Sequence, residues 1–444
     1  MHTTAPVSRR AVLGGLSVGA LTVGGASRAA AATPQAGAPV LPDPSTVTAS
    51  DPADLGVLEA ASLLQARRLS SRELTQACLD RITARNAPVN AWVRTYPELA
   101  LRLADAADTR LSSAACGSLG AAPLLAGVPV GLKGLYAVKG LPLTASSKTL
   151  DGSSGIFPVN IAAGDSTVWA RLKAAGMPLL GHTQMSEFAF STGTPQTGNP
   201  WDTTKSPGGS SGGSAAALAA RMTPAATGSD TGGSLRLPSS ACGTTTIKAT
   251  YGLISTYGVL PLEWSYDNAG PMARSVADVA LLLSYLAGAD DHDAATLAGR
   301  PPAFYPTSPT PGPKPLSGKR IGISNSPSDG SLSAGILAVL ARVKGELAAL
   351  GASLVPVTSP VDPTTTTAGM ALVAEVKTFH SQLYPARAAY YTPFVAEILA
   401  LYEGENRWPP LRRSRSLPRA VHGRVEPRLR RRHARRGAPA DADR

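Results

Sequence analysis

Two serine clusters, each surrounded by glycine, are the residues in this sequence most suited to chemistry. They are KSPGGSSGGS at 205–214 and GSDTGGS at 228–234. Because glycine has no Cβ, the backbone around it adopts positive φ and approaches a ligand closely, so successive N–H groups can converge on one point. Converging amides beside a hydroxyl are what acyl transfer to serine requires, since the developing oxyanion needs preorganised donors.

A serine nucleophile also needs a base. None of the six histidines stands in a distinctive setting, so a lysine must be considered. A lysine acts as a base only when burial or a cationic neighbour keeps it neutral. Lys133 lies in the apolar stretch AGVPVGLKGLY at 126–136, and Lys248 in TTTIKATYG at 244–252 is the rival candidate.

Several longer segments occur together in the order and spacing of one family. They are GVPVGLK, DSTVWARLKAAGMPLLGHTQMSEFAF, GNPWD, GGSSGGSAAALAA, GSDTGGSLRLPSSACG and LPLEWSYDNAGPMARSVADVALLL. From about residue 55 to about residue 401 the chain therefore resembles the amidase signature family of serine hydrolases. The resemblance implies an α/β fold in which helices cover both faces of a central mixed β-sheet. It also implies hydrolysis of a carboxylic amide through an acyl-serine, with no cofactor and no metal.

The resemblance further implies roles for single residues. Ser234 becomes the nucleophile, Ser210 follows a cis peptide bond and passes the proton, and Lys133 is the base. The amides of residues 231–234 would form the oxyanion hole, which involves Thr231, Gly232 and Gly233 besides the nucleophile. We expect supporting roles for Ser211, Asp230 and Arg236. Asp230 and Arg236 are expected to brace the loop that carries the nucleophile.

Helical and strand patterns alternate along the chain, which predicts an α/β architecture. Ser70 and Glu73 form a capping box that divides residues 55–86 into two helices. Short apolar runs bounded by Gly and Pro predict buried strands at 127–135 and 177–183. The remaining predictions are helices at 165–176 and 275–288, and a strand, helix and strand at 319–324, 335–351 and 353–358.

The two ends of the chain differ in composition from the rest. Residues 407–444 hold thirteen Arg, no Lys and three acids, so most of the net charge of +12 lies there. At the other end, Arg9 and Arg10 precede a glycine-rich apolar run that is too short for a membrane span. This pattern predicts a twin-arginine signal peptide.

We therefore divide the chain into four parts. They are a signal peptide (1–32), a polar lead (33–52), an amidase domain incomplete at its C-terminal end (53–402) and an Arg/Pro-rich tail, disordered or frameshifted (403–444). The predicted location is extracellular or periplasmic, and the twin-arginine export machinery is the predicted partner of the precursor. The expected substrate is a small-molecule or peptide amide, with no nucleic-acid partner and no stable membrane anchor.

Three alternatives stay open. Residues 208–212 also satisfy GxSxG, the nucleophile elbow of α/β-hydrolases, with Ser210 as nucleophile and a histidine and an acid elsewhere. The polar, proline-bearing segment at 199–207 is not typical of the buried strand that such an elbow follows. The chain could instead be an exported protein that binds polyanions through its basic tail, or a truncated and inactive amidase remnant.

Overall fold

The computed structural model describes residues 40–115, 122–297, 312–324, 332–357 and 368–404. The predicted signal peptide and residues 405–444 of the predicted tail lie outside the described residues, so their interpretations stay predictions. Residues 403 and 404, which we assigned to the tail, are helical instead.

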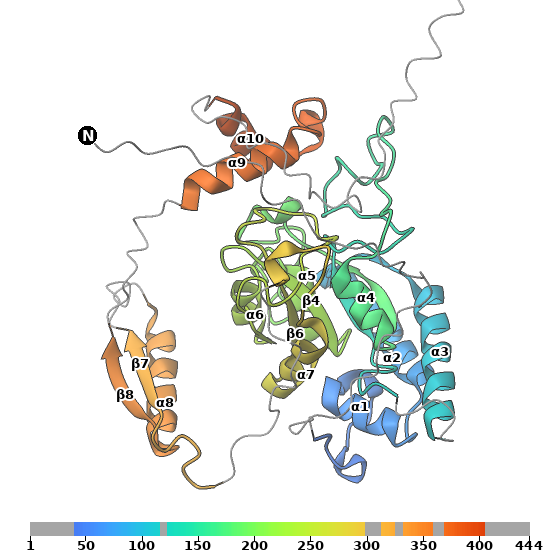
Figure 1. Cartoon of the computed structure of the whole chain (residues 1–444), viewed down its shortest axis with the longest axis vertical. Helices are drawn as coiled ribbons and strands as arrows, with labels where there is room; N and C mark the ends of the chain where they lie inside the picture. Colours follow the sequence, from blue (N-terminus) through green and yellow to red (C-terminus); the bar gives the residue numbers. More distant parts are fainter. Residues whose placement is uncertain (1–39, 116–121, 298–311, 325–331, 358–367, 405–444) are drawn as a thin grey trace, which may run out of the picture. The chain divides into compact units, whose positions relative to one another are not determined.

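A six-stranded mixed sheet lies at the centre of the fold, in the order β1-β3-β2-β4-β6-β5 (Figure 1). Strand β2 is parallel to β3 and β4, whereas β1, β5 and β6 run antiparallel to their neighbours. Every residue of β2, β3, β4 and β6 is buried, as expected for strands covered on both faces. The strands are β1 Trp92–Thr95, β2 Val130–Lys133, β3 Leu179–Thr183, β4 Ala225–Asp230, β5 Thr245–Thr246 and β6 Asn268–Ala273.

The helices begin and end where local chemistry predicts. Ser70 Oγ accepts the N–H of Glu73 and the Glu73 carboxylate accepts the N–H of Ser70, so the capping box starts α2. Helix α4 ends just before Gly176, whose φ of +82° is one that glycine adopts easily. The helices are α1 Val57–Gln65, α2 Ser71–Val89, α3 Pro97–Ala115, α4 Thr167–Ala174, α5 Gly212–Ala219, α6 Arg236–Cys242, α7 Val276–Leu286, α8 Ala334–Ala349, α9 Ala368–His380 and α10 Pro393–Gly404.

Helices cover both faces of the sheet. Ala226 and Met272, which pair across β4 and β6, belong to a small cluster with side chains of α5 and α6. Their chain neighbours Ala225 and Ala273 belong to the large core, together with side chains of α7. Because successive strand residues point to opposite faces, α5 and α6 pack on one face of β4 and β6 and α7 packs on the other. This confirms the predicted α/β architecture.

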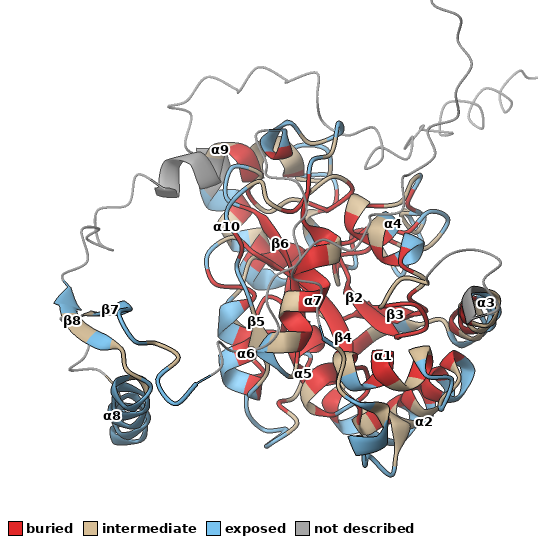
Figure 2. Cartoon of the chain, turned by 60° about the horizontal axis from the view of Figure 1, so that its bottom comes forward, coloured by how far each residue is buried: buried red, intermediate tan, exposed pale blue. Residues whose placement is uncertain are grey.

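The predicted strand, helix and strand after residue 318 are β7 Arg320–Ser324, α8 and β8 Ser353–Val357, and the two strands pair in parallel. Helix α8 has no buried residue, whereas the central strands are buried throughout (Figure 2). Among the described helices, none is long and apolar enough to cross a membrane.

Candidate active site

Lys133 is the last residue of β2 and is fully buried. Its Nζ lies 2.7 Å from Ser210 Oγ and 2.8 Å from Ser229 Oγ. The parallel register that pairs Gly131 with Ala226 brings Lys133 to the carboxyl end of β4. Adjacent parallel strands end at the same edge of a sheet, so this pairing carries the lysine to the segment that contains the second serine cluster.

Burial lowers the pKa of Lys133 to about 7, while the negative charges of Asp267 and Asp230 act in the opposite direction. The two groups within hydrogen-bond distance of Nζ are hydroxyls, and neither carries a charge. Desolvation disfavours the ammonium form and leaves the neutral amine as a proton acceptor. The arrangement is therefore chemically suited to general-base catalysis near neutral pH.

Ser210 and Ser234 lie on loops that lead into α5 and α6. The peptide bond between Gly209 and Ser210 is cis, as the sequence resemblance implies. Ser210 is fully buried, whereas Ser234 keeps 8% of its surface exposed. The backbone N–H of Ser211 donates to Ser234 O at 3.3 Å and joins the two loops. In the described structure no hydrogen bond links the Ser210 and Ser234 hydroxyls, so their proton transfer stays a prediction.

Asp230 folds the nucleophile loop around its carboxylate. It accepts the N–H groups of Gly233 at 2.7 Å and Leu235 at 3.2 Å. Arg236 donates two further hydrogen bonds to the same carboxylate, at 2.9 and 3.0 Å. Burial by itself would raise the pKa of Asp230, but the hydrogen bonds from Arg236 and Gly233 hold it below its ordinary value. These contacts are the bracing that we expected of Asp230 and Arg236.

The Gly233 amide differs from the sequence-based expectation. Because its N–H donates to Asp230, it is not directed toward an incoming carbonyl. The physical reason is that a buried carboxylate needs donors, and the nearest backbone amide supplies one. Thr231, Gly232 and Ser234 remain as candidate oxyanion donors, and Gly232 is exposed to solvent.

Sequence reasoning missed Ser229, whose hydroxyl lies beside Lys133 Nζ. The one available signal was its position in GSDTGGS, five residues before the predicted nucleophile. Ser211 Oγ contacts the backbone N and O of Ser229, both at 3.3 Å, so its support reaches the lysine indirectly. The rival Lys248 is exposed and donates to the carbonyl of Ala249. Of the two candidate lysines, only Lys133 is hydrogen-bonded to serines of the two clusters, Ser210 and Ser229.

The three histidines that the structure describes do not form the catalytic pair that an α/β-hydrolase needs. His182 bonds to a tyrosine hydroxyl and a backbone carbonyl, His380 to another tyrosine hydroxyl and His292 to an aspartate. Among the described residues no histidine hydrogen-bonds to Ser210 or Ser234. Residues 203–209 ahead of Ser210 also form no strand, so the elbow geometry is lacking there.

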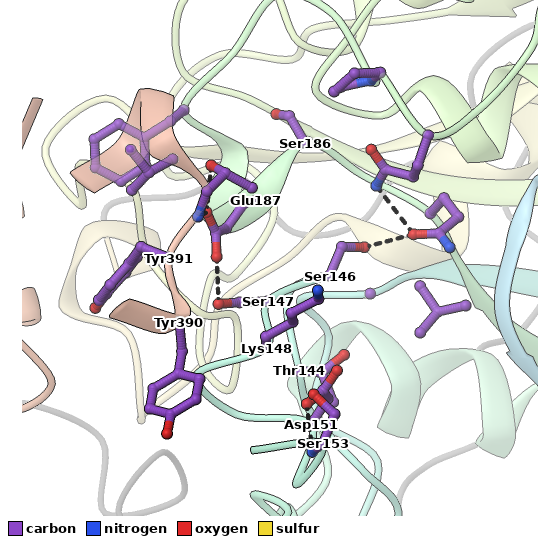
Figure 3. A pocket seen from close by; sticks show the side chains of 18 of the residues that line it. Thr144, Ser146, Ser147, Lys148, Asp151, Ser153, Ser186, Glu187, Tyr390 and Tyr391 are labelled. Atoms are coloured by element: carbon purple, nitrogen blue, oxygen red, sulfur yellow. Dashed lines mark hydrogen bonds between the residues drawn. The ribbon is translucent and has the colours of Figure 1, made fainter. Parts of the chain in front are cut away.

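The structure also has a cavity of about 1190 Å³, and Figure 3 shows side chains that line it. Neither Ser210 nor Ser234 lines it, but it reaches Gly134, the residue after Lys133. It also reaches Ser186, whose N–H donates to Ser210 O at 3.2 Å. Hydroxyl groups and aromatic rings both line the cavity, and they include Thr144, Ser146, Ser147, Tyr390, Tyr391 and Phe394.

Glu187 joins two segments of the cavity lining. Its carboxylate accepts the Ser147 hydroxyl at 2.5 Å, the contact drawn in Figure 3. It also accepts the N–H and the hydroxyl of Thr392, at 2.7 and 2.6 Å. The segment before α10 is thereby held against the loop that follows β2.

Comparison with known proteins gives consistent matches. A model of the amidase family matches residues 73–402. A glutamyl-tRNA(Gln) amidotransferase subunit of Burkholderia vietnamiensis is 42% identical over 313 residues, which cover 68% of this chain and 60% of the relative. The chain thus spans about 60% of the length of the curated relatives it matches.

Solved structures show the same likeness. The peptide amidase from Stenotrophomonas maltophilia has a TM-score of 0.68 at 29% identity, over 83% of this chain and 78% of that one. The corresponding glutamyl-tRNA(Gln) amidotransferase subunit from Thermotoga maritima has a TM-score of 0.62 at 26% identity, over 80% of this chain and 74% of that one.

Proposed function

Because the chain belongs to the amidase family, we propose that it hydrolyses a carboxylic amide through an acyl-serine intermediate on Ser234. The observation that carries this proposal is the buried Lys133 amine, held 2.7 Å from Ser210 Oγ where the two serine segments meet. The lowered pKa of Lys133, about 7, supports its role as the base.

In the proposed cycle, neutral Lys133 accepts the proton of the Ser210 hydroxyl as Ser210 accepts that of Ser234. The Ser234 oxygen then attacks the amide carbonyl carbon, and the loop amides stabilise the oxyanion that forms. When the intermediate collapses, the C–N bond breaks and the amine leaves with a proton from Ser210, which Lys133 replaces. Water attacks the acyl-serine through the same relay, which releases a carboxylic acid and restores Ser234.

We propose a small-molecule or peptide amide as the substrate. The cavity beside Gly134 has room for a substrate of this size, because its volume of about 1190 Å³ exceeds the range of about 300–1,000 Å³ that is typical of ligand sites. Its mixed lining suits a ligand with both polar and apolar parts. Action outside the cytoplasm is part of the proposal and rests on the predicted signal peptide.

The test is covalent labelling of the purified chain with a fluorophosphonate, followed by peptide mapping. We expect the label on Ser234, and we expect it to disappear in Ser234→Ala. Ser239→Ala is the matched control, because Ser239 is a buried serine of α6 whose hydroxyl has no partner in the described structure. A label on Ser210 would support the α/β-hydrolase alternative and overturn the proposed roles.

A panel of neutral aliphatic amides and peptide amides then tests the reaction itself. Release of ammonia together with the matching carboxylic acid is the expected result. A labelled Ser234 with no turnover of any amide in the panel would contradict amide hydrolysis while leaving the serine chemistry intact.

A further inference from the structure

Asp267 is a buried carboxylate just before β6, with 6% of its surface exposed. None of the ion pairs within the described residues includes it. We propose that Asp267 is a positioning residue for the acyl transfer: its carboxylate holds Thr231 at the start of the loop that carries Ser234, and its unpaired charge acts on the Lys133 amine. The proposal rests on the proposed function.

The hydrogen bonds of Asp267 connect two loops. Its Oδ1 accepts the Thr231 hydroxyl at 2.5 Å. Its Oδ2 accepts the N–H groups of Leu262 at 3.0 Å and Glu263 at 3.2 Å. Thr231 is the first residue after β4 and lies three residues before Ser234, so Asp267 anchors the start of the nucleophile loop.

Within the part of the chain that the structure describes, no ion pair offsets the charge of Asp267. Asp267 and Asp230 are the two charges that raise the pKa of Lys133 against the effect of burial, and Asp267 has the larger effect. Asp230 is paired with Arg236, which offsets its field. Asp267 lacks such a partner, so it stabilises the ammonium that forms when Lys133 takes a proton.

The other titratable groups around Asp267 do not replace this charge. Burial, with the charges of Glu375 and Asp267, raises the pKa of Glu263 to about 7. Burial raises the pKa of Asp267 itself to about 6, against the hydrogen bond from Thr231. Asp267 is therefore anionic above that pH. Glu375, on α9, accepts the N–H of Ser265, and the phenols of Tyr136 and Tyr251 have pKa values above their ordinary value.

A purely structural role is the rival explanation, and the chain offers a matched control for it. Asp293 also accepts two backbone N–H groups, those of Thr256 at 2.8 Å and Ala295 at 3.1 Å, together with the Thr256 hydroxyl at 3.1 Å. It is not among the charges that act on Lys133. Asp293→Asn therefore removes the same kind of loop contact without changing the field at the lysine.

The experiment measures the rate of Ser234 modification by a fluorophosphonate from pH 5 to 9. In the parent we expect the rate to rise with pH as Lys133 loses its proton. Asp267→Asn is expected to move this rise to a pH about one unit lower, because Lys133 then loses its proton more readily. The plateau rate should fall roughly tenfold, because Lys133 is then a weaker base. Thr231→Val removes the hydrogen bond to Asp267 but keeps the charge of Asp267. We therefore expect a lower plateau rate, with the rise at the same pH as in the parent. Asp293→Asn changes neither.

An unshifted rise in Asp267→Asn overturns the proposal, whatever happens to the plateau. Asp267→Ser is the second charge-removing variant, for use if the asparagine variant does not fold, and its rise must move in the same direction. A shifted rise in Asp293→Asn also overturns the proposal, since a loop contact would then explain the effect. If the parent protein is never labelled at Ser234, the proposed function itself is overturned. If the parent is labelled but the rise does not shift in Asp267→Asn, only the role of Asp267 is overturned.

Discussion

At the residue scale, the proposed chemistry depends on the charge of the Lys133 side chain. Lys133 is fully buried, and its amine has two hydroxyls as close partners where a structural lysine would have a carboxylate. A salt bridge would hold the amine protonated and unable to act as a base. The pairing of Asp230 with Arg236 offsets one of the two carboxylate charges that act on this lysine.

Activity is therefore expected to depend on the protonation of Lys133. Because its pKa is lowered to about 7 and the neutral form is the base, kcat/KM should rise as pH increases through about 7. Lys133→Met should lower kcat/KM about 10³-fold or more at the plateau.

Lys248→Met is the control, since Lys248 is exposed and does not contact the serines. Initial rates of ammonia release across pH 5 to 9 provide the measurement. Retention of parental rates in Lys133→Met would exclude the lysine base.

At the element scale, glycines allow α5 to approach the sheet. A Cβ on Gly213 would lie 2.5 Å from the carbonyl oxygen of Ala91 and from backbone atoms of Gln184. Such contacts are closer than real Cβ atoms show, and backbone atoms cannot rotate away. Because Gly213 has no side chain, α5 packs close to these backbone atoms. This close packing brings the serine cluster at the start of α5 to Lys133.

Gly213→Ala tests this close packing. Alanine is better than glycine in a helix by about 1 kcal/mol, but overpacking against backbone costs about 1–3 kcal/mol or more, so a net destabilisation is expected. Gly232→Ala is the control, because a Cβ there meets nothing within 4 Å. Denaturant unfolding of both variants is the measurement. Equal stability of the two variants would show that α5 shifts without cost.

The cavity wall depends on Glu187, a buried residue of the short 3-10 helix Glu187–Ala189. Glu187→Ala removes the acceptor of the Ser147 hydroxyl and of the Thr392 N–H and hydroxyl, and a buried hydrogen-bonding group left without its partner costs about 1–3 kcal/mol. We expect a loss of about 2–3 kcal/mol in the free energy of unfolding and faster proteolysis between residues 385 and 395.

Glu397→Ala serves as the control, because Glu397 is an exposed acid of α10. Unchanged proteolysis in Glu187→Ala would mean that the aromatic contacts alone hold this segment. Those contacts include the packing of Phe188 against Tyr391, with ring centroids 5.7 Å apart.

At the scale of the whole molecule, the basic charge is concentrated outside the described body. Most of the net charge of +12 lies in residues 407–444. The other 406 residues therefore carry a net charge of only +2. The protein's proposed site of action depends on the N-terminal segment and not on the fold.

Export is tested by replacing the paired arginines. In a bacterium with twin-arginine machinery, Arg9→Lys with Arg10→Lys should keep the precursor in the cytoplasm, because the pair is the recognised signal. Arg67→Lys with Arg68→Lys changes a second arginine pair, in the folded body, and should leave export intact. The measurement is cell fractionation, together with the size of the product, which decreases when the signal peptide is removed. Unaffected export of the first variant would contradict the proposed route.

The sequence by itself determined the local features of this protein. Helix limits such as the Ser70 capping box, the buried strands and the two serine segments follow from periodicity, caps and glycine, which act over a few residues. Lys133 was identified through its apolar setting and the family resemblance. The mixed sheet and its helical covering followed from the same resemblance.

Only the tertiary structure decided which groups meet. Ser229 reaches Lys133, and Asp267 reaches Thr231, because neighbouring strands bring together residues 96 and 36 positions apart. The Gly233 amide turns to Asp230, which is only three residues earlier, because the fold buries this carboxylate and a buried carboxylate takes the donors around it. A pKa depends on burial and on charges nearby in space, and neither quantity can be read from local sequence.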